Sequence, residues 1–149
     1  MSNSTPVNGW EITPYEGVGP LRFGMTRSQV RSLLGGKVTT FRKGPYASTD
    51  TDAYDELGLH LHYDNGDRLE CIEAWGPCPI YYQRASLLNA NTQEVLERLA
   101  GLGLSSRYDD GYFLDDAGFA LYAPDDVVEA VTVYPRGYYD ERPDETSNG

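Results

Sequence analysis

The chain has 149 residues, a formal net charge of −11 and a sequence pI of about 4.4. This length fits one domain or two small fused subdomains, and the apolar and charged fractions are those of a folded protein. Because phosphate binding needs clustered Lys and Arg side chains, the acidic balance argues against a nucleic-acid partner. It suits a basic protein partner, although simple solubility explains the same charge equally well.

The start of the chain carries no signal for export or membrane insertion. Residues 1–6 have neither a basic nor an apolar region, and no apolar run approaches the roughly 18 residues of a membrane span. The sequence therefore predicts a cytoplasmic protein without membrane contact, with a removed signal peptide as the alternative. Cys71 and Cys78 are too few for a disulfide framework, so free thiols are expected, and a single bridge between them is the alternative.

Residues 1–20 are dense in Pro and Gly, which predicts an irregular lead with at most a short strand at 10–12. A helix is expected over 24–35. Thr26 and Gln29 form a capping-box pattern at its start, and Gly35 suits its end. Its apolar stripe consists of Val30, Leu33 and Leu34.

A strand is expected over 37–42, followed by a long polar loop over 43–55. The alternating runs 57–63 and 68–75 flank Asn65-Gly66, the pattern typical of a type I′ hairpin. Residues 77–90 form a connector that is ambiguous between strand and loop.

A second helix is expected over 91–101, capped by Asn91 or Thr92, with Leu96, Leu99 and Val95 as its stripe. Residues 107–108 and 112–114 flank a turn at 109–111. The runs 117–122 and 127–134 predict a second hairpin, and the charged tail 140–149 is expected to fray.

The two helices and the two hairpins align with each other. Thr26 aligns with Thr92, and Val30 aligns with Leu96. This predicts an α+β fold with two tandem helix-plus-hairpin repeats, over 21–76 and 91–139, that form one curved antiparallel sheet with the helices on one face. Chance similarity between two α+β units is the alternative.

The period-2 alternation of the strands separates two faces of that sheet. Leu59, Leu61, Tyr63, Phe119 and Leu121 are expected to face the helices. The open face is expected to carry His60, His62, Glu73, Trp75, Tyr122 and Tyr134. Tyrosine accounts for 12 of the 149 residues, and Tyr and Trp are enriched at protein interfaces. Ordinary sheet tyrosines are the alternative. The candidate partner-binding residues are this open-face set together with Tyr112, Asp109 and Asp110.

Residues 23–30, Phe-Gly-Met-Thr-Arg-Ser-Gln-Val, close at Leu33-Leu34-Gly35 and lead to a sheet. This phrase resembles the repeat of β-lactamase inhibitory protein and of the related outer-membrane assembly lipoprotein domain. The resemblance implies tandem helix-plus-sheet units and a sheet face that grips a protein through aromatic residues. It favours a non-catalytic inhibitor, in particular an immunity protein that neutralises a basic toxin or enzyme. A scaffold domain of the assembly-lipoprotein type is the alternative.

The sequence contains no motif that predicts catalysis. His60 and His62 share one strand face, and Glu73 or Cys71 could complete a zinc site, but two exposed strand histidines are the favoured interpretation. A metal-dependent enzyme is therefore the weaker alternative. No phosphate loop or dinucleotide fingerprint is present in the sequence. We expect no cofactor, no metal and no catalytic residue.

Overall fold

A computed structural model describes residues 10–42, 44–45 and 49–139. The fold combines antiparallel sheets with two helices, α1 (Arg27–Leu34) and α2 (Thr92–Gly101), and strands predominate. The predicted mixture of helix and antiparallel sheet is confirmed, with more strand than expected. The first nine residues and the tail 140–149, predicted to fray, lie outside the described residues.

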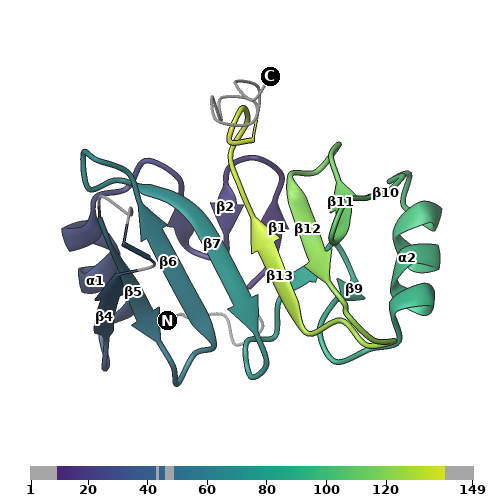
Figure 1. Cartoon of the computed structure of the whole chain (residues 1–149), viewed down its shortest axis with the longest axis horizontal. Helices are drawn as coiled ribbons and strands as arrows, with labels where there is room; N and C mark the ends of the chain where they lie inside the picture. The colour runs from purple at the N-terminus through teal and green to yellow at the C-terminus, as the bar shows by residue number, and fades with distance from the viewer. Residues whose placement is uncertain (1–9, 43, 46–48, 140–149) are drawn as a thin grey trace, which may run out of the picture.

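One eight-stranded antiparallel sheet dominates the molecule, in the order β10-β11-β12-β13-β7-β6-β5-β4 (Figure 1). The chain forms β4 to β7 after α1 and β10 to β13 after α2. Its strands are β4 (Thr39–Arg42), β5 (Asp50–Tyr54), β6 (Leu59–Tyr63), β7 (Leu69–Trp75), β10 (Arg107–Tyr108), β11 (Tyr112–Leu114), β12 (Phe119–Tyr122) and β13 (Ala130–Val133). β7 and β13 therefore join two four-stranded halves at the centre of the sheet.

Two small sheets form a second layer. The first is three-stranded and consists of β1 (Ile12–Thr13), β2 (Gly17–Val18) and β3 (Leu21–Arg22). The second pairs β8 (Tyr81–Tyr82) with β9 (Ala85–Ser86). The prediction of an irregular lead over 1–20 is thus wrong from residue 12 onward, because a tight turn after β1 lets this Gly-rich segment pair with itself.

The predicted helices and hairpins are confirmed. In α1, the Thr26 amide donates to Gln29 Oε1 at 2.9 Å, and the Gln29 amide donates to Thr26 Oγ1 at 3.1 Å. Asn91, one of the two expected caps, begins α2. The hairpins β6–β7 and β12–β13 both form. The type I′ turn predicted at Asn65-Gly66 is wrong, because Asp67 has positive φ and these two residues do not.

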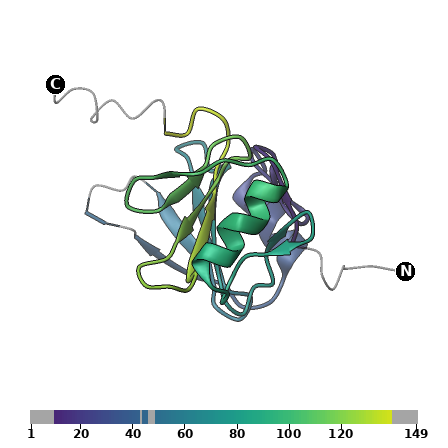
Figure 2. The same cartoon turned by 90° about the vertical axis from the view of Figure 1, so that its right-hand side faces the viewer.

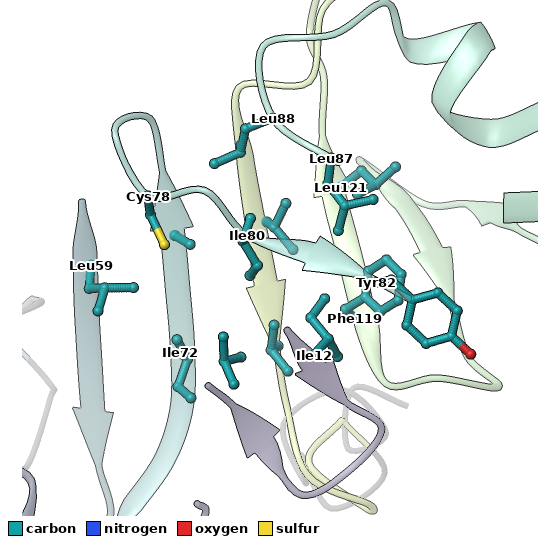
Figure 3. Close-up of a cluster of buried hydrophobic side chains, with 14 of the residues drawn as sticks. Ile12, Leu59, Ile72, Cys78, Ile80, Tyr82, Leu87, Leu88, Phe119 and Leu121 are labelled. Carbon is teal, nitrogen blue, oxygen red and sulfur yellow. The ribbon is translucent and has the colours of Figure 1, made fainter. Parts of the chain in front are cut away.

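The core lies between the main sheet and the second layer. We call the sheet face that carries Leu59, Leu61 and Leu121 the inner face, and all three residues are fully buried. Figure 2 shows both helices on this side of the sheet. Figure 3 shows Tyr82 of the connector beside Phe119 of β12, and Ile80, Leu87 and Ile72 belong to the same buried cluster. The expectation that Leu59, Leu61, Tyr63, Phe119 and Leu121 point inward is confirmed.

The two helices are anchored by different chemistry. In α1 only Val30 is fully buried, whereas Leu33 of the predicted stripe is 49% exposed. The helix is held instead by Arg27 and Arg31, whose Nη1 and Nη2 atoms lie 2.8 and 2.7 Å from Asp52 Oδ1. The Asp52 side chain is 0% exposed. In α2, by contrast, apolar side chains such as Val95 and Leu99 enter the core.

Strand β5 is the main element that the sequence did not reveal. It lies within the segment predicted as a loop, because Asp50, Thr51 and Asp52 break the apolar alternation of a half-buried strand. Asp52 faces inward opposite Leu61. Its burial depends on the two arginines of α1, since an unpaired carboxylate would not be stable there.

Candidate functional site

The outer face of the main sheet is the face that neither helix covers (Figure 2). One lateral row of paired residues crosses all eight strands on this face. From β4 to β10 the row consists of Thr39, Ala53, His60, Glu73, Thr132, Ala120, Phe113 and Arg107. Because side chains alternate along each strand, the next rows on the same face hold Phe41, His62, Trp75 and Tyr122.

The half of the outer face formed by β4 to β7 carries an accessible aromatic cluster. The Phe41 ring lies 5.0 Å from the His60 ring, and the His60 ring lies 4.5 Å from the Trp75 ring, both edge to face. We call Phe41, His60 and Trp75 the open aromatic cluster. Phe41 is 39% exposed, and the other two rings are half-buried. Edge-to-face contacts fix these rings in place, so the cluster is a rigid surface.

Glu73 occupies the centre of the outer face between two histidines. Its Oε1 atom lies 2.9 Å from His62 Nε2 and 3.9 Å from His60 Nδ1. His62 is held on its other side by Thr51, whose hydroxyl lies 2.9 Å from Nδ1. These contacts fix the Glu73 carboxylate on the surface beside Trp75, with 35% of its side chain exposed.

The half formed by β11 to β13 is covered by the end of the described chain. Tyr134, directly after β13, contacts Tyr138 and Tyr139 at ring distances of 6.3 and 4.9 Å. We call Tyr15, Tyr134, Tyr138 and Tyr139 the tyrosine cluster. Tyr134 is 5% exposed, and burial raises the pKa values of Tyr134 and Tyr138 above the ordinary tyrosine value. The segment 135–139 therefore covers the end of this half that carries Tyr134, whereas Tyr122 at the opposite end stays exposed.

The register places several acidic turns at one end of the sheet. Trp75 pairs with Ala130, which pairs with Tyr122, and the Trp75 amide donates to Gly58 O at 2.9 Å. The turns after β5, β10 and β12 therefore lie at the same end as Trp75 and Tyr122. We call their exposed carboxylates the acidic rim, which consists of Asp55, Glu56, Asp109, Asp110, Asp125, Asp126 and Glu129.

The structure brings together part of the residue set predicted from the sequence. His60, Glu73, Trp75 and Tyr122 lie on the outer face and are accessible to a partner, and Tyr122 is 52% exposed. Asp109 and Asp110 are exposed in the acidic rim.

Three predicted residues lie elsewhere or are covered. Tyr134 and His62 belong to the outer face but are buried at 5% and 7% exposure, because segment 135–139 covers Tyr134 and neighbouring side chains enclose His62. Tyr112 pairs with Leu121 and packs against the core, so it lies on the inner face. These three are therefore not available to a partner on the outer face.

Phe41 is the accessible residue that sequence reasoning missed. The strand that contains Phe41 is predicted from the sequence. Phe41 lies two residues after Thr39 and therefore shares the outer face with it. The pairing of Phe41 with Thr51 of β5 places Phe41 on this face of the main sheet. The sequence predicts a loop in place of β5, so this pairing could not be inferred.

The described residues contain no group of three or more His, Cys, Asp or Glu side chains arranged to hold a metal ion. Cys71 and Cys78 are both buried, and no disulfide joins them. Burial raises the pKa of the Cys78 thiol to about 12. A thiol with such a pKa is a poor nucleophile at neutral pH.

Comparisons with protein-family models, with curated proteins and with solved structures found no match to this chain. Within the described part of the chain, neither helix has the length and apolar character needed to cross a membrane.

Proposed function

We propose that this protein is a non-catalytic inhibitor that binds a basic protein through its outer sheet face, over the β4–β7 half and the adjoining Tyr122 of β12. The main observation in support of this proposal is the open aromatic cluster with Glu73 beside it, on a rigid sheet and next to the acidic rim. An immunity protein that neutralises a toxin or enzyme in the cytoplasm is the form of this function that the family resemblance favours. The proposal includes neither nucleic-acid nor membrane binding.

The aromatic side chains supply the chemistry of a protein-binding hot spot. Trp and Tyr residues dominate such hot spots because they bury a large area at low entropic cost. Trp75 and Tyr122 stand on either side of Ala130, roughly 10 Å apart across two strand spacings. Only the small side chain of Ala130 stands between these two rings in their row.

The charge distribution supports a basic partner. The formal net charge is −11, and the acidic rim gathers seven exposed carboxylates at the Trp75 end of the sheet. A field of one sign speeds association with a partner of opposite sign. Glu73 then offers one carboxylate inside the contact itself, where a lysine or arginine can pair with it.

We also propose that the two halves of the molecule are copies of one unit, as the resemblance implies. Matching backbone hydrogen bonds support this proposal. Three hydrogen bonds of the first half each have a counterpart in the second half. Arg27 N–Asp67 O corresponds to Thr92 N–Asp126 O, and Leu69 N–Met25 O corresponds to Val128 N–Ala90 O. Trp75 N–Gly58 O corresponds to Tyr134 N–Gly118 O. In this alignment Thr26 corresponds to Asn91, whereas the sequence alignment pairs Thr26 with Thr92, one residue later.

Two glycines add to this correspondence. Gly58 and Gly118 both have positive φ, at +76° and +73°. A Cβ at Gly58 would lie 2.4 Å from Trp75 O, and one at Gly118 would lie 3.1 Å from Tyr134 O. Each turn therefore needs glycine for the same two reasons, a left-handed backbone and a close approach.

Affinity capture with the tagged chain as bait tests the function. We expect a basic protein at stoichiometric yield from a lysate of the source organism, and a purified complex of the two chains that elutes as one species. Trp75→Ala should weaken that complex by more than about 1 kcal/mol, whereas Tyr108→Ala, which truncates a 68% exposed tyrosine outside the outer face, should not.

Two results would contradict the proposal. One is equal affinity of Trp75→Ala and wild type for the captured protein. The other is that a well-folded bait captures no basic protein although lysates from several growth conditions are used.

A further inference from the structure

A second site, independent of the proposed function, lies where the tyrosine cluster meets the turn after β11. The tyrosine cluster, Arg107, Asp115 and Gly137 line a cavity of about 220 Å³. This is smaller than the roughly 300–1,000 Å³ of pockets for drug-sized ligands. The cavity therefore fits a small head group rather than a large molecule.

The walls of this cavity come from three separate parts of the chain. Tyr15 belongs to the turn between β1 and β2, Asp115 follows β11, and Tyr138 and Tyr139 belong to the segment after β13. The Tyr15 hydroxyl donates to the Asp115 carbonyl oxygen. The Tyr138 and Tyr139 rings meet edge to face at 5.0 Å. The aromatic walls are thus held in place by mutual contacts and do not depend on one flexible loop.

One ring of the cavity wall, Tyr15, and one neighbouring ring, Phe113, already carry cations of the chain itself. The Arg136 guanidinium carbon lies 4.1 Å from the centre of the Tyr15 ring, and the Arg107 guanidinium carbon lies 4.5 Å from the centre of the Phe113 ring. Both distances are within the roughly 6 Å of an attractive cation–π contact. Rings in this region therefore meet positive charge in the geometry that stabilises it.

Asp115 supplies a negative charge at the same place. Its Oδ2 atom lies 2.5 Å from Arg107 Nε, and its Oδ1 atom lies 3.5 Å from the Tyr134 hydroxyl. The side chains of Arg107 and Asp115 are 52% and 51% exposed. Exposed ion pairs contribute little to stability, so an incoming cation can share or replace Arg107 on this carboxylate.

We propose that this cavity binds an organic cation, with a guanidinium or alkylammonium head group between the tyrosine rings and the Asp115 carboxylate. Aromatic walls with one carboxylate are the chemistry that recognises such groups. The head group belongs either to a free small molecule or to an arginine or lysine side chain of a protein.

Titration calorimetry with choline, agmatine and the neutral choline analogue 3,3-dimethylbutanol tests this proposal on the wild-type chain. We expect saturable binding of at least one cation, and at least tenfold weaker binding of the neutral analogue. Asp115→Asn and Tyr139→Leu should each weaken cation binding at least tenfold. Tyr108→Leu, a matched tyrosine outside the cavity, should bind as wild type does.

Amide chemical shifts in an NMR titration place the bound cation, with changes expected at Tyr134 and Gly137. A short arginine peptide, acetyl-Gly-Arg-Gly-amide, separates the two sources. Tighter binding of the peptide than of agmatine assigns the cavity to a protein side chain, and the reverse assigns it to a free molecule. The proposal is overturned when neither cation saturates, or when choline and its neutral analogue bind equally well to the wild-type chain.

Discussion

The two halves of the main sheet, β4–β7 and β10–β13, hold their helices by different interactions. Each half places one helix against the inner face. In the first half, α1 is held by the ion pairs of Arg27 and Arg31 with the buried Asp52, whereas in the second half Val95 and Leu99 of α2 enter the core. Sequence patterns reveal the second kind of attachment more readily than the first, because only apolar anchoring leaves a helical stripe.

The outer faces of the two halves differ as well. Trp75 is the last residue of β7 and Tyr134 directly follows β13, and each donates its amide to the carbonyl oxygen of a glycine in a neighbouring turn. After Trp75 the chain turns inward to the buried Cys78 and Ile80, which leaves Trp75 accessible. After Tyr134 the chain folds back over the outer face and buries it. The direction of the following segment thus decides which of these two aromatic side chains stays accessible on the outer face.

The largest effect is expected at the anchor of α1. Asp52→Asn should lower the free energy of unfolding by about 3–5 kcal/mol, because it leaves two arginines without their buried carboxylate. Urea denaturation followed by circular dichroism measures this. The matched control is Asp50→Asn, which removes an exposed ion pair with Arg42 and should change the stability by less than about 1 kcal/mol. Equal effects of the two variants would show that Asp52 is not the anchor.

The second half should respond to apolar truncation instead. Leu99→Ala should cost about 2–5 kcal/mol, since Leu99 is fully buried and its loss leaves a cavity. Leu102→Ala, just beyond α2 and 38% exposed, is the control and should have a small effect. Thermal unfolding of both variants measures the difference, and similar melting temperatures would contradict the difference in anchoring.

The covered half should make stability sensitive to alkaline pH. Burial raises the pKa values of Tyr134 and Tyr138 in the folded state, whereas tyrosines of the unfolded chain ionise near pH 10. The unfolded state therefore binds fewer protons above about pH 10, and folding stability falls as the pH rises further. Spectrophotometric titration should show tyrosines that ionise only on unfolding. Ionisation of all tyrosines near pH 10 without unfolding would show that segment 135–139 leaves this half open.

The smallest effect is expected in the acidic rim. Asp125→Asn combined with Asp126→Asn should slow association with the captured basic protein several-fold and leave dissociation nearly unchanged, because rim charges act mainly on encounter. Surface plasmon resonance at two salt concentrations measures both rates. An effect confined to the dissociation rate would assign these residues to the contact itself.

Local patterns were sufficient for the hairpins and helices but not for the environment of the outer face. Asn65-Gly66 and the Thr26–Gln29 capping box specify their elements within a few residues. Strand β5 depends on Asp52, whose partners lie on α1, so no local pattern predicts it.

Two predicted site residues are not accessible on the outer face because of contacts that are distant in the sequence. Alternation predicts that Tyr134 lies on the outer face, yet its burial depends on a segment that returns over the sheet. The position of Tyr112 is set by its register with Leu121, which the turn at 109–111 does not reveal.

Hydroxyl-radical footprinting of the purified complex with the captured basic protein tests the central claim most directly. If the binding surface is the β4–β7 half of the outer face together with the adjoining Tyr122 of β12, then Phe41, Trp75 and Tyr122 should lose reactivity on binding, whereas Tyr108 should keep it. Protection of Tyr108 or of the exposed α1 residue Leu33, with Phe41 and Trp75 unchanged, would contradict the account and move the interface away from the outer face.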